Sequence, residues 1–208
     1  MLCNTDVVGR VYEQIDERLA EWLRAQRVFF VATAPDAADG LVNCSPKGNR
    51  DELAIVDEHT VAYLDQTGSG VETIAHLRDN GRIVLMFCAF EGPPRIVRLH
   101  GHGRFCQPGE PGFDESSSRF PGAGGVGVRS IVTVNVERIA DSCGYGVPLM
   151  TFNRHRPTMD DWSRRKGAAG ITDYQAQRNA VSVDGLDGLR LHPPGSAETS
   201  APSPGGRP

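Results

Sequence analysis

Several features that mark other classes of protein are scarce or missing in this chain of 208 residues. No apolar run approaches the ~20 residues that a helix needs to cross a bilayer. The N-terminus lacks the basic stretch and apolar core of a signal peptide. Lys and Arg (22) do not outnumber Asp and Glu (26), and the net charge of −4 argues against a nucleic-acid partner. We therefore expect a cytoplasmic protein that binds neither nucleic acid nor membrane.

Cysteine is sparse, and its spacing forms no known pattern. The five residues are Cys3, Cys44, Cys88, Cys106 and Cys143, and no two of them are spaced as C-x-x-C. An odd number without paired spacing favours reduced thiols over a disulfide framework or a zinc site. Cys44 and Cys88 lie in apolar runs, so we predict that both are buried and unreactive.

The hydrophobic pattern predicts short strands with few helices between them. An amphipathic helix is expected over 9–26, and strands are expected over 28–34, 41–45, 53–56, 61–65, 83–90, 95–105 and 130–139. A helix is expected over 71–79, ended by Asn80-Gly81 as a left-handed cap. The run 83–90 is almost wholly apolar and predicts a strand buried on both faces. A doubly wound parallel sheet would need more helices, so the pattern favours a small antiparallel barrel.

The composition changes after the last predicted strand. Residues 9–140 make up the predicted barrel domain, and 141–190 form a polar extension with two short helices near 158–166 and 172–180. Thr158 and Thr172 each begin a pattern typical of a capping box. Residues 191–208 are rich in Pro, Gly, Ser and Ala, and we predict a disordered tail.

The stretch with the clearest chemical meaning is the strand at 61–65, followed by Gly68-Ser69-Gly70 and then by a helix. Free backbone N–H groups and the positive end of the helix dipole favour an anion at such a turn. The dinucleotide motif G-x-G-x-x-G would need glycine where Thr73 stands. A tight turn with a capped helix explains the tripeptide alone equally well.

A second segment compatible with phosphate lies at the end of another predicted strand. Ser45 and Lys47 precede a glycine there, and Lys47 can neutralise an anion. An exposed hairpin lysine is the simpler interpretation of this segment taken alone. Adjacent strands bring the two segments together, and their pairing favours a phosphate site.

The strand at 95–105 carries four polar candidates. Arg95 and Arg98 fit either a solvated edge or a polar cleft. His100 and His102 are two residues apart and therefore predicted to share a face. A metal site is conceivable, but we favour a hydrogen-bonded pair of histidines, because no further ligand lies at suitable spacing.

At this point the residues resemble a known family. Asn43-Cys-Ser-Pro-Lys-Gly48, Leu64-Asp-Gln-Thr-Gly-Ser-Gly-Val-Glu-Thr-Ile-Ala-His-Leu-Arg-Asp-Asn-Gly81 and Arg98-Leu-His-Gly101 are similar to segments of the pyridoxamine 5′-phosphate oxidase-like flavin-binding split-barrel proteins. The resemblance covers about residues 9–190. It implies a mainly β fold, a six-stranded antiparallel split barrel with flanking helices and a C-terminal helical extension.

The resemblance also implies a homodimer with FMN in a groove at its interface, and a flavin-dependent oxidoreductase whose substrate is unknown. A small-molecule substrate and a nicotinamide electron donor are its expected partners, and no catalytic acid or base is assigned. The implied cofactor-binding residues are Val42, Asn43, Cys44, Ser45, Lys47, Tyr63, Leu64, Ser69, Gly70, Val71, Thr73, Arg95 and Arg98. In the family, the strand at Arg95 to Arg98 often reaches the cofactor of the other subunit.

The chain departs from the family pattern at one place that would affect binding of the FMN phosphate. The oxidase has an Arg-Lys pair where this chain has Glu72-Thr73, so we expect Glu72 to point away and Lys47 to compensate. The alternatives are a non-enzymatic flavin- or haem-binding module, with His100 or His102 as the axial ligand, and a deazaflavin-dependent reductase.

Overall fold

The computed structural model describes residues 9–190, so Cys3 and the predicted tail at 191–208 lie outside the described residues. The elements, in chain order, are β1 (Val11–Tyr12), α1 (Glu17–Ala25), β2 (Phe29–Thr33), β3 (Asn43–Lys47), β4 (Leu53–Asp57), β5 (Thr60–Gln66), α2 (Glu72–Asp79), β6 (Arg82–Cys88), β7 (Ile96–Cys106), α3 (Phe113–Ser117), β8 (Val128–Ser142) and α4 (Thr158–Arg178).

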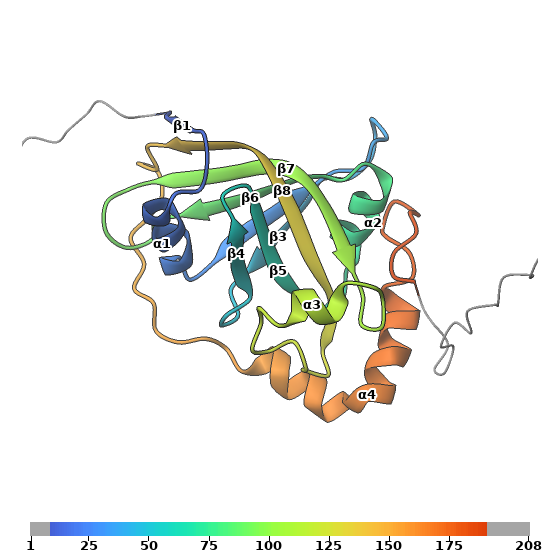
Figure 1. Ribbon diagram of the computed structural model, residues 1–208. Coiled ribbons are helices and arrows are strands. Elements are labelled where there is room, and N and C mark those ends of the chain that lie inside the picture. Colours follow the sequence, from blue (N-terminus) through green and yellow to red (C-terminus); the bar gives the residue numbers. More distant parts are fainter. Residues whose placement is uncertain (1–8, 191–208) are drawn as a thin grey trace, which may run out of the picture.

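All the strands form one antiparallel sheet that curls into a barrel (Figure 1). Its order is β3-β2-β6-β7-β8-β5-β4, and β1 pairs with β8. β3 and β4 follow one another in the chain but are the two edges of this order, so the barrel is split between them. The predicted fold class is confirmed, although the sheet has eight strands rather than six.

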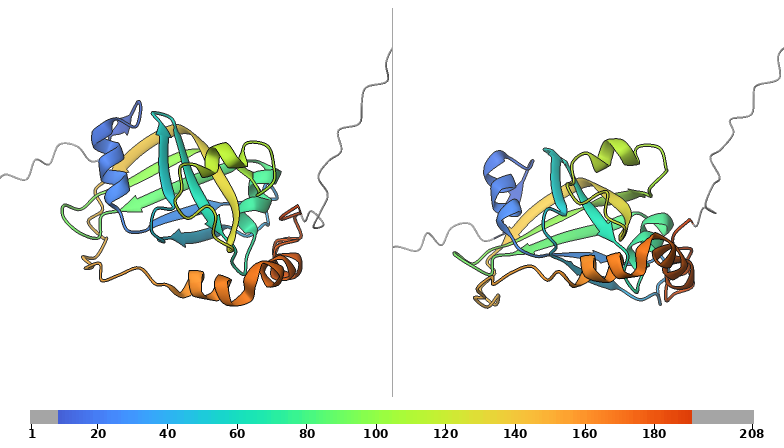
Figure 2. Two further views of the ribbon diagram at one scale, coloured as in Figure 1. Left: turned by 60° about the horizontal axis from the view of Figure 1, so that its bottom comes forward. Right: turned by 90° about the horizontal axis from the view of Figure 1, so that it is seen from below.

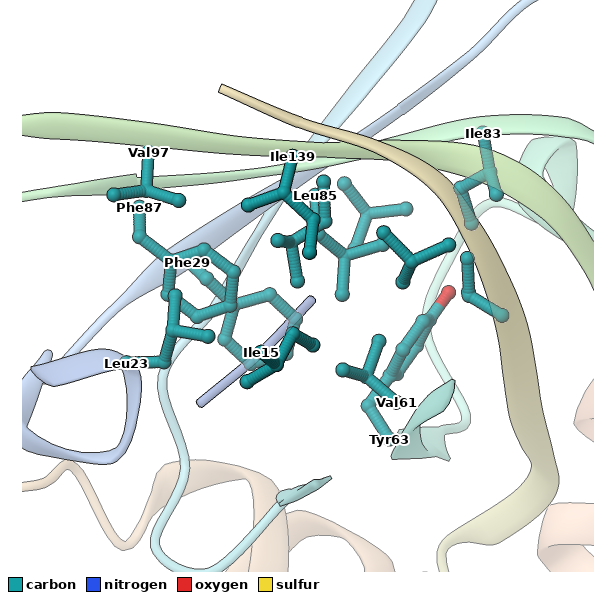
Figure 3. Packing of buried hydrophobic residues seen from close by; sticks show 14 of the residues in the cluster. Ile15, Leu23, Phe29, Val61, Tyr63, Ile83, Leu85, Phe87, Val97 and Ile139 are labelled. Atoms are coloured by element: carbon teal, nitrogen blue, oxygen red, sulfur yellow. The ribbon is translucent and has the colours of Figure 1, made fainter. Parts of the chain in front are cut away.

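The barrel interior holds the main hydrophobic core. Phe29 stacks on Phe87 at 5.4 Å between ring centroids and meets the edge of Tyr63 at 5.8 Å (Figure 3). Aliphatic side chains from β5, β6, β7 and β8 fill the rest, and α1 covers one end with Leu19 and Leu23. Alternation along each strand places these residues inside, since successive side chains point to opposite faces.

The first helix is shorter than predicted. It begins at Glu17 because the Asp16 side chain accepts a hydrogen bond from the Leu19 N–H and caps it. Val11 and Tyr12, which we expected to be helical, instead pair with Ile139 and Ala140 of β8.

The strand predicted to stop at Ser45 continues through Pro46 to Lys47. Pro46 is tolerated because β3 is an edge strand, where a missing N–H costs no ladder bond on the open side. Cys44 is exposed on this strand, so the prediction of a buried thiol is wrong there, whereas Cys88 is buried and burial raises the pKa of its thiol.

The prediction that β6 is buried on both faces is also wrong for the single chain. Ile83, Leu85 and Phe87 point into the core, but Val84 and Met86 on the outer face are only partly covered. The apolar outer face of this strand is thus left without a complete cover within the described residues.

α2 has the predicted form. Val71, Ile74, Ala75 and Leu77 are buried, and Gly81 adopts a left-handed conformation (φ +74°) after the Asn80 cap. The extension also contains the two expected helices, joined into α4 across a kink at Gly167 (φ +69°).

The capping-box predictions in the extension are wrong. Pro157, rather than Thr158, occupies the N-cap position of α4, and Thr172 lies inside the second helix with its hydroxyl donating to the Ala168 carbonyl. In the two views of Figure 2 the extension runs along one side of the barrel and ends beside α2. No helix within residues 9–190 is both long enough and apolar enough to span a bilayer.

Candidate functional site

A polar groove of about 320 Å³ opens where the barrel is split. Its walls are β3, the turn after it, the loop between β5 and α2, and the start of β8. Its lining residues are Asn43, Ser45, Pro46, Lys47, Gly48, Asn49, Glu52, Gln66, Gly68, Ser69, Gly70, Glu72, Thr73, Arg129 and Met159. Six of the predicted cofactor-binding residues therefore meet there: Asn43, Ser45, Lys47, Ser69, Gly70 and Thr73.

Alternation along β3 explains why three of these residues face the groove. Asn43, Ser45 and Lys47 are partly buried, whereas Cys44 and Pro46 between them are exposed on the opposite face. The Asn43 amide donates to the hydroxyls of Thr33 (3.2 Å) and Thr73 (3.0 Å), and Ser45 donates to the Asn43 amide oxygen (3.0 Å). This chain of hydrogen bonds ties β3 to the start of α2.

The start of α2 presents unpaired donors to the groove. Val71 is the N-cap and provides no side-chain acceptor. Within residues 9–190, no acceptor is hydrogen-bonded to the backbone N–H groups of Gly70, Glu72 or Thr73. Such N–H groups, together with the helix dipole, favour an anion at this end of the groove.

Beneath the groove lies a buried carboxylate between two cations. Asp65 accepts from Lys47 Nζ at 2.7 Å and from Arg129 Nε at 2.5 Å. Burial alone raises the pKa of Asp65, but the charges of Arg129 and Lys47 outweigh it and hold that pKa below its usual range. Asp65 thereby fixes the position of both cations that line the groove.

Arg129 is the functional candidate that the sequence reasoning missed. The register between β5 and β8 shifts at this point, from Asp65 opposite Ser130 to Gln66 opposite Val128. Arg129 is the extra residue of this bulge, and a bulge redirects a side chain. The guanidinium also donates to the Gly70 carbonyl (2.6 Å) and to the Asn179 side chain (3.2 Å). No periodicity in the sequence marks a bulge, so no signal identified this residue.

Glu72 does not point away as expected. It lines the groove, and its carboxylate folds back over Gly70, where an added Cβ would collide with Oε2. A carboxylate at this place interacts favourably with the N-terminus of α2. It also takes up part of the space that an anionic ligand would use.

The C-terminal extension supports the anion-binding loop. Asn179 donates to the Gly68 carbonyl at 3.0 Å, and Gln175 donates to the Thr67 hydroxyl at 2.8 Å. Leu189 packs on Val71 and Ile74 in a small apolar cluster. These contacts hold the loop between β5 and α2 in place beside the groove.

The other predicted site residues do not line the groove of this chain. Val42 and Cys44 are exposed, whereas Leu64 and Val71 are buried in apolar clusters. Tyr63 is fully buried in the barrel core (Figure 3), and its hydroxyl has no hydrogen-bond partner within the described residues.

Arg95 immediately precedes β7, and Arg98 lies near the N-terminal end of that strand. Arg95 donates to the Tyr12 hydroxyl (2.7 Å), pairs with Asp141 (3.5 Å) and lies over the Trp22 ring at 4.7 Å. Arg98 donates to the Ser142 hydroxyl at 3.0 Å. Neither residue lines the groove of its own chain.

The two histidines of β7 do not act as a pair. They share the outer face of β7 as predicted, because both line the same shallow depression, but His102 is hydrogen-bonded to Glu137 at 2.8 Å rather than to His100. Burial and the charges of Arg138 and Arg98 lower the pKa of His100. No group of three or more potential metal ligands occurs among residues 9–190.

A larger pocket of about 690 Å³ continues from the groove past Lys47, Gly48, Asn49 and Glu52. Arg27, Arg50 and Arg119 line it from three separate segments, and within residues 9–190 none of them has a carboxylate partner within 4.0 Å. Phe152 lies under the Arg27 guanidinium at 5.0 Å. This pocket is suited to a small anionic molecule beside the groove.

The fold and the site together define a split antiparallel barrel with a polar groove at its open edge, and that groove is compatible with an anion. The sequence matches then assign the family. A family profile described as "Pyridoxamine 5'-phosphate oxidase" matches residues 15–143. The "Pyridoxamine 5'-phosphate oxidase family protein ustO" of Aspergillus flavus is 37% identical over 192 residues, which is 86% of this chain and 77% of that protein. The chain belongs to the pyridoxamine 5′-phosphate oxidase family.

Solved structures show partial similarity. HupZ from Group A Streptococcus is 25% identical, with a TM-score of 0.47 over 60% of this chain and 91% of that one. An FAD-binding protein from Mesorhizobium loti is 17% identical, with a TM-score of 0.45 over 65% of this chain and 97% of that one. The family assignment rests on the sequence matches.

Proposed function

We propose that this protein binds a flavin nucleotide in the groove, with FMN as the smallest flavin nucleotide that fits it. We also propose that the protein acts as a flavin-dependent oxidoreductase on a small molecule. The observation that carries the proposal is the convergence on one groove of the hydroxyls of Ser45 and Thr73, the cations Lys47 and Arg129, and the unpaired N–H groups of α2. Family membership supports it, because oxidases give the family its name.

The donor set fits a phosphate group. Charge-assisted donors from Lys47 and Arg129 would bind its oxygens, and the Thr73 hydroxyl and the N–H groups of α2 would orient it. The bound flavin would supply hydride transfer at its ring, while the protein supplies position, charge and exclusion of water. Glu52, which also lines the groove, is buried, and burial raises the pKa of its carboxyl.

Replacing Lys47 by alanine is expected to weaken FMN binding about tenfold, the scale of one charge-assisted contact. Arg129 remains to hold Asp65, so the fold is expected to survive. Titration of the full chain with FMN, followed by quenching of flavin fluorescence, measures the change. Arg18→Ala, which removes a cation on α1 outside the groove, is the control. Unchanged FMN affinity in Lys47→Ala would place the phosphate elsewhere, and absence of any flavin binding would refute the proposal.

We also propose that two copies of the chain associate through the outer face of β2 and β6. Phe30, Ala32, Val84 and Met86 are only partly buried there, and a shallow, largely apolar depression of about 440 Å³ lies beside them around Val42. A second copy offers an identical apolar surface, as a two-fold interface requires. It would also bring the partner's face with Arg98 and His100 close to β3.

Met86→Lys is expected to convert a dimer into a monomer, because it would place a charge in the middle of this apolar contact. Sedimentation velocity of the full chain measures the molecular mass, and Asp114→Lys on α3, which does not line the depression, is the control. A wild-type protein that sediments as a monomer at micromolar concentration would contradict the proposal.

A further inference from the structure

A further pocket, of about 430 Å³, lies between α4 and the loop that precedes α2. It is distinct from the basic pocket beyond Lys47 and is built mainly by the C-terminal extension. Its lining residues are Asn49, Thr67, Gly68, Ser69, Arg156, Thr158, Met159, Trp162, Arg165 and Tyr174.

The kink at Gly167 creates the aromatic wall of this pocket. It turns the chain so that Trp162 of the first half of α4 meets Tyr174 of the second half, at 5.0 Å between ring centroids and 80° between planes. Lys166 lies against both rings, at 5.4 and 5.1 Å. The bond from Gln175 to the Thr67 hydroxyl fixes this wall to the loop.

Two arginines add positive charge to the wall. Among residues 9–190, no carboxylate lies within 4.0 Å of Arg156 or Arg165, whereas the neighbouring Arg164 is paired with Asp161 at 2.8 Å. Aromatic rings offer a surface for a flat base, and free guanidinium groups bind phosphate oxygens. A nucleotide combines both groups.

The pocket adjoins the phosphate end of the groove. Asn49, Gly68, Ser69 and Met159 line both cavities. Apart from Gly68 and its two chain neighbours, no heavy atom of the described chain lies within 4 Å of the position that a Cβ on Gly68 would take, so a ligand can approach the backbone there. A molecule whose first phosphate lies at the start of α2 can therefore continue past Gly68 and Ser69 towards Trp162.

We propose that this pocket binds the adenylate end of a dinucleotide. The proposal rests on the proposed function in one respect, namely that the neighbouring groove holds the flavin phosphate. The same adenylate chemistry can come from a flavin dinucleotide, whose own second half would fill the pocket, or from a nicotinamide dinucleotide that binds separately.

The test compares four ligands on the full chain by calorimetry: FMN, FAD, NADPH and AMP. FAD is expected to bind about tenfold more tightly than FMN, the scale of stacking one base on an aromatic side chain. Trp162→Ala and Arg165→Ala should each abolish this advantage and leave FMN affinity unchanged, and Trp162→Phe should restore most of it. Arg164→Ala, the adjacent arginine outside the pocket, should change neither affinity.

The outcomes distinguish a flavin dinucleotide from a nicotinamide dinucleotide as the source of the adenylate. They also distinguish failure of the adenylate pocket from failure of the flavin proposal. If FAD and FMN bind equally but AMP and NADPH bind in a manner that depends on Trp162, the adenylate belongs to a separate nicotinamide dinucleotide. If FMN binds while AMP and NADPH do not, and FAD has no advantage, the adenylate pocket is refuted and the flavin proposal stands. If AMP binds but no flavin does, the flavin proposal fails and the adenylate pocket stands.

Discussion

Replacing Asp65 by alanine is expected to lower the free energy of unfolding by about 3–5 kcal/mol, because it leaves the cations Lys47 and Arg129 without their shared carboxylate. The Asp65 side chain has no exposed area, and those of Arg129 and Lys47 are only 6% and 15% exposed. Ser130 also donates to this carboxylate at 3.3 Å. Removing this buried carboxylate leaves its three donors without their acceptor, which costs free energy because they are shielded from water.

The effect should depend on pH in a defined direction. The pKa of Asp65 is lower in the folded chain than in the unfolded one, so folded protein binds fewer protons at this site. Its contribution to stability is therefore complete above the unfolded pKa of about 4 and is lost as the pH falls towards the folded value. The wild type should lose stability between neutral pH and pH 3 more steeply than Asp65→Ala does.

Urea unfolding at pH 7 and pH 3, followed by circular dichroism, measures both quantities. Asp173→Ala, at an exposed position of α4, is the control and should change stability by no more than about 0.5 kcal/mol. A loss of less than 1 kcal/mol in Asp65→Ala would mean that this carboxylate does not hold the two cations in place.

The strand pattern and the position of α2 could be predicted because both depend on local hydrophobic periodicity. Val71, Ile74 and Leu77 mark the buried face of α2, and Asn80-Gly81 marks its end. The start of the first helix could not be predicted from hydrophobic periodicity. Its apolar spacing continues back to Val11, but pairing with β8 at the barrel edge overrides that local preference.

Part of the groove could likewise be predicted, namely six of its fifteen lining residues. Asn43, Ser45 and Lys47 alternate on one strand, and Thr73 follows a recognisable turn. The rest depends on contacts between distant segments: Arg129 reaches the groove through a bulge, and Asn179 reaches Gly68 from the extension. A sequence shows neither a bulge nor which face of the barrel an extension will cover.

The position predicted for Glu72 is wrong because repulsion from a ligand phosphate is only one of the forces on this side chain. The unpaired N–H groups of α2 also attract the nearest carboxylate, and Glu72 is at the right distance to fold back over Gly70. The same side chain therefore stabilises the helix and opposes anion binding in the groove.

Reversing the charge at Glu72 is expected to produce the largest gain in affinity for a flavin phosphate. The groove is lined by two cations, Lys47 and Arg129, and by two carboxyl groups, Glu52 and Glu72. Glu72→Gln removes one negative charge beside the phosphate position and should tighten FMN binding about tenfold. Glu72→Lys also adds a cation there and should tighten FMN binding about a hundredfold. The further gain is on the scale of an additional charge-assisted hydrogen bond.

Riboflavin separates this charge effect from a change of shape, because it has the same ring and side chain but no phosphate. Its affinity should stay the same in both variants, and the gain for FMN should shrink as salt rises, since screening weakens the added attraction. Glu115→Lys makes the same charge change on α3, away from the groove, and should leave both affinities unaltered. If Glu72→Lys tightens riboflavin as much as FMN, or tightens neither, the phosphate is not held at the start of α2, and the groove binds its ligand by another group.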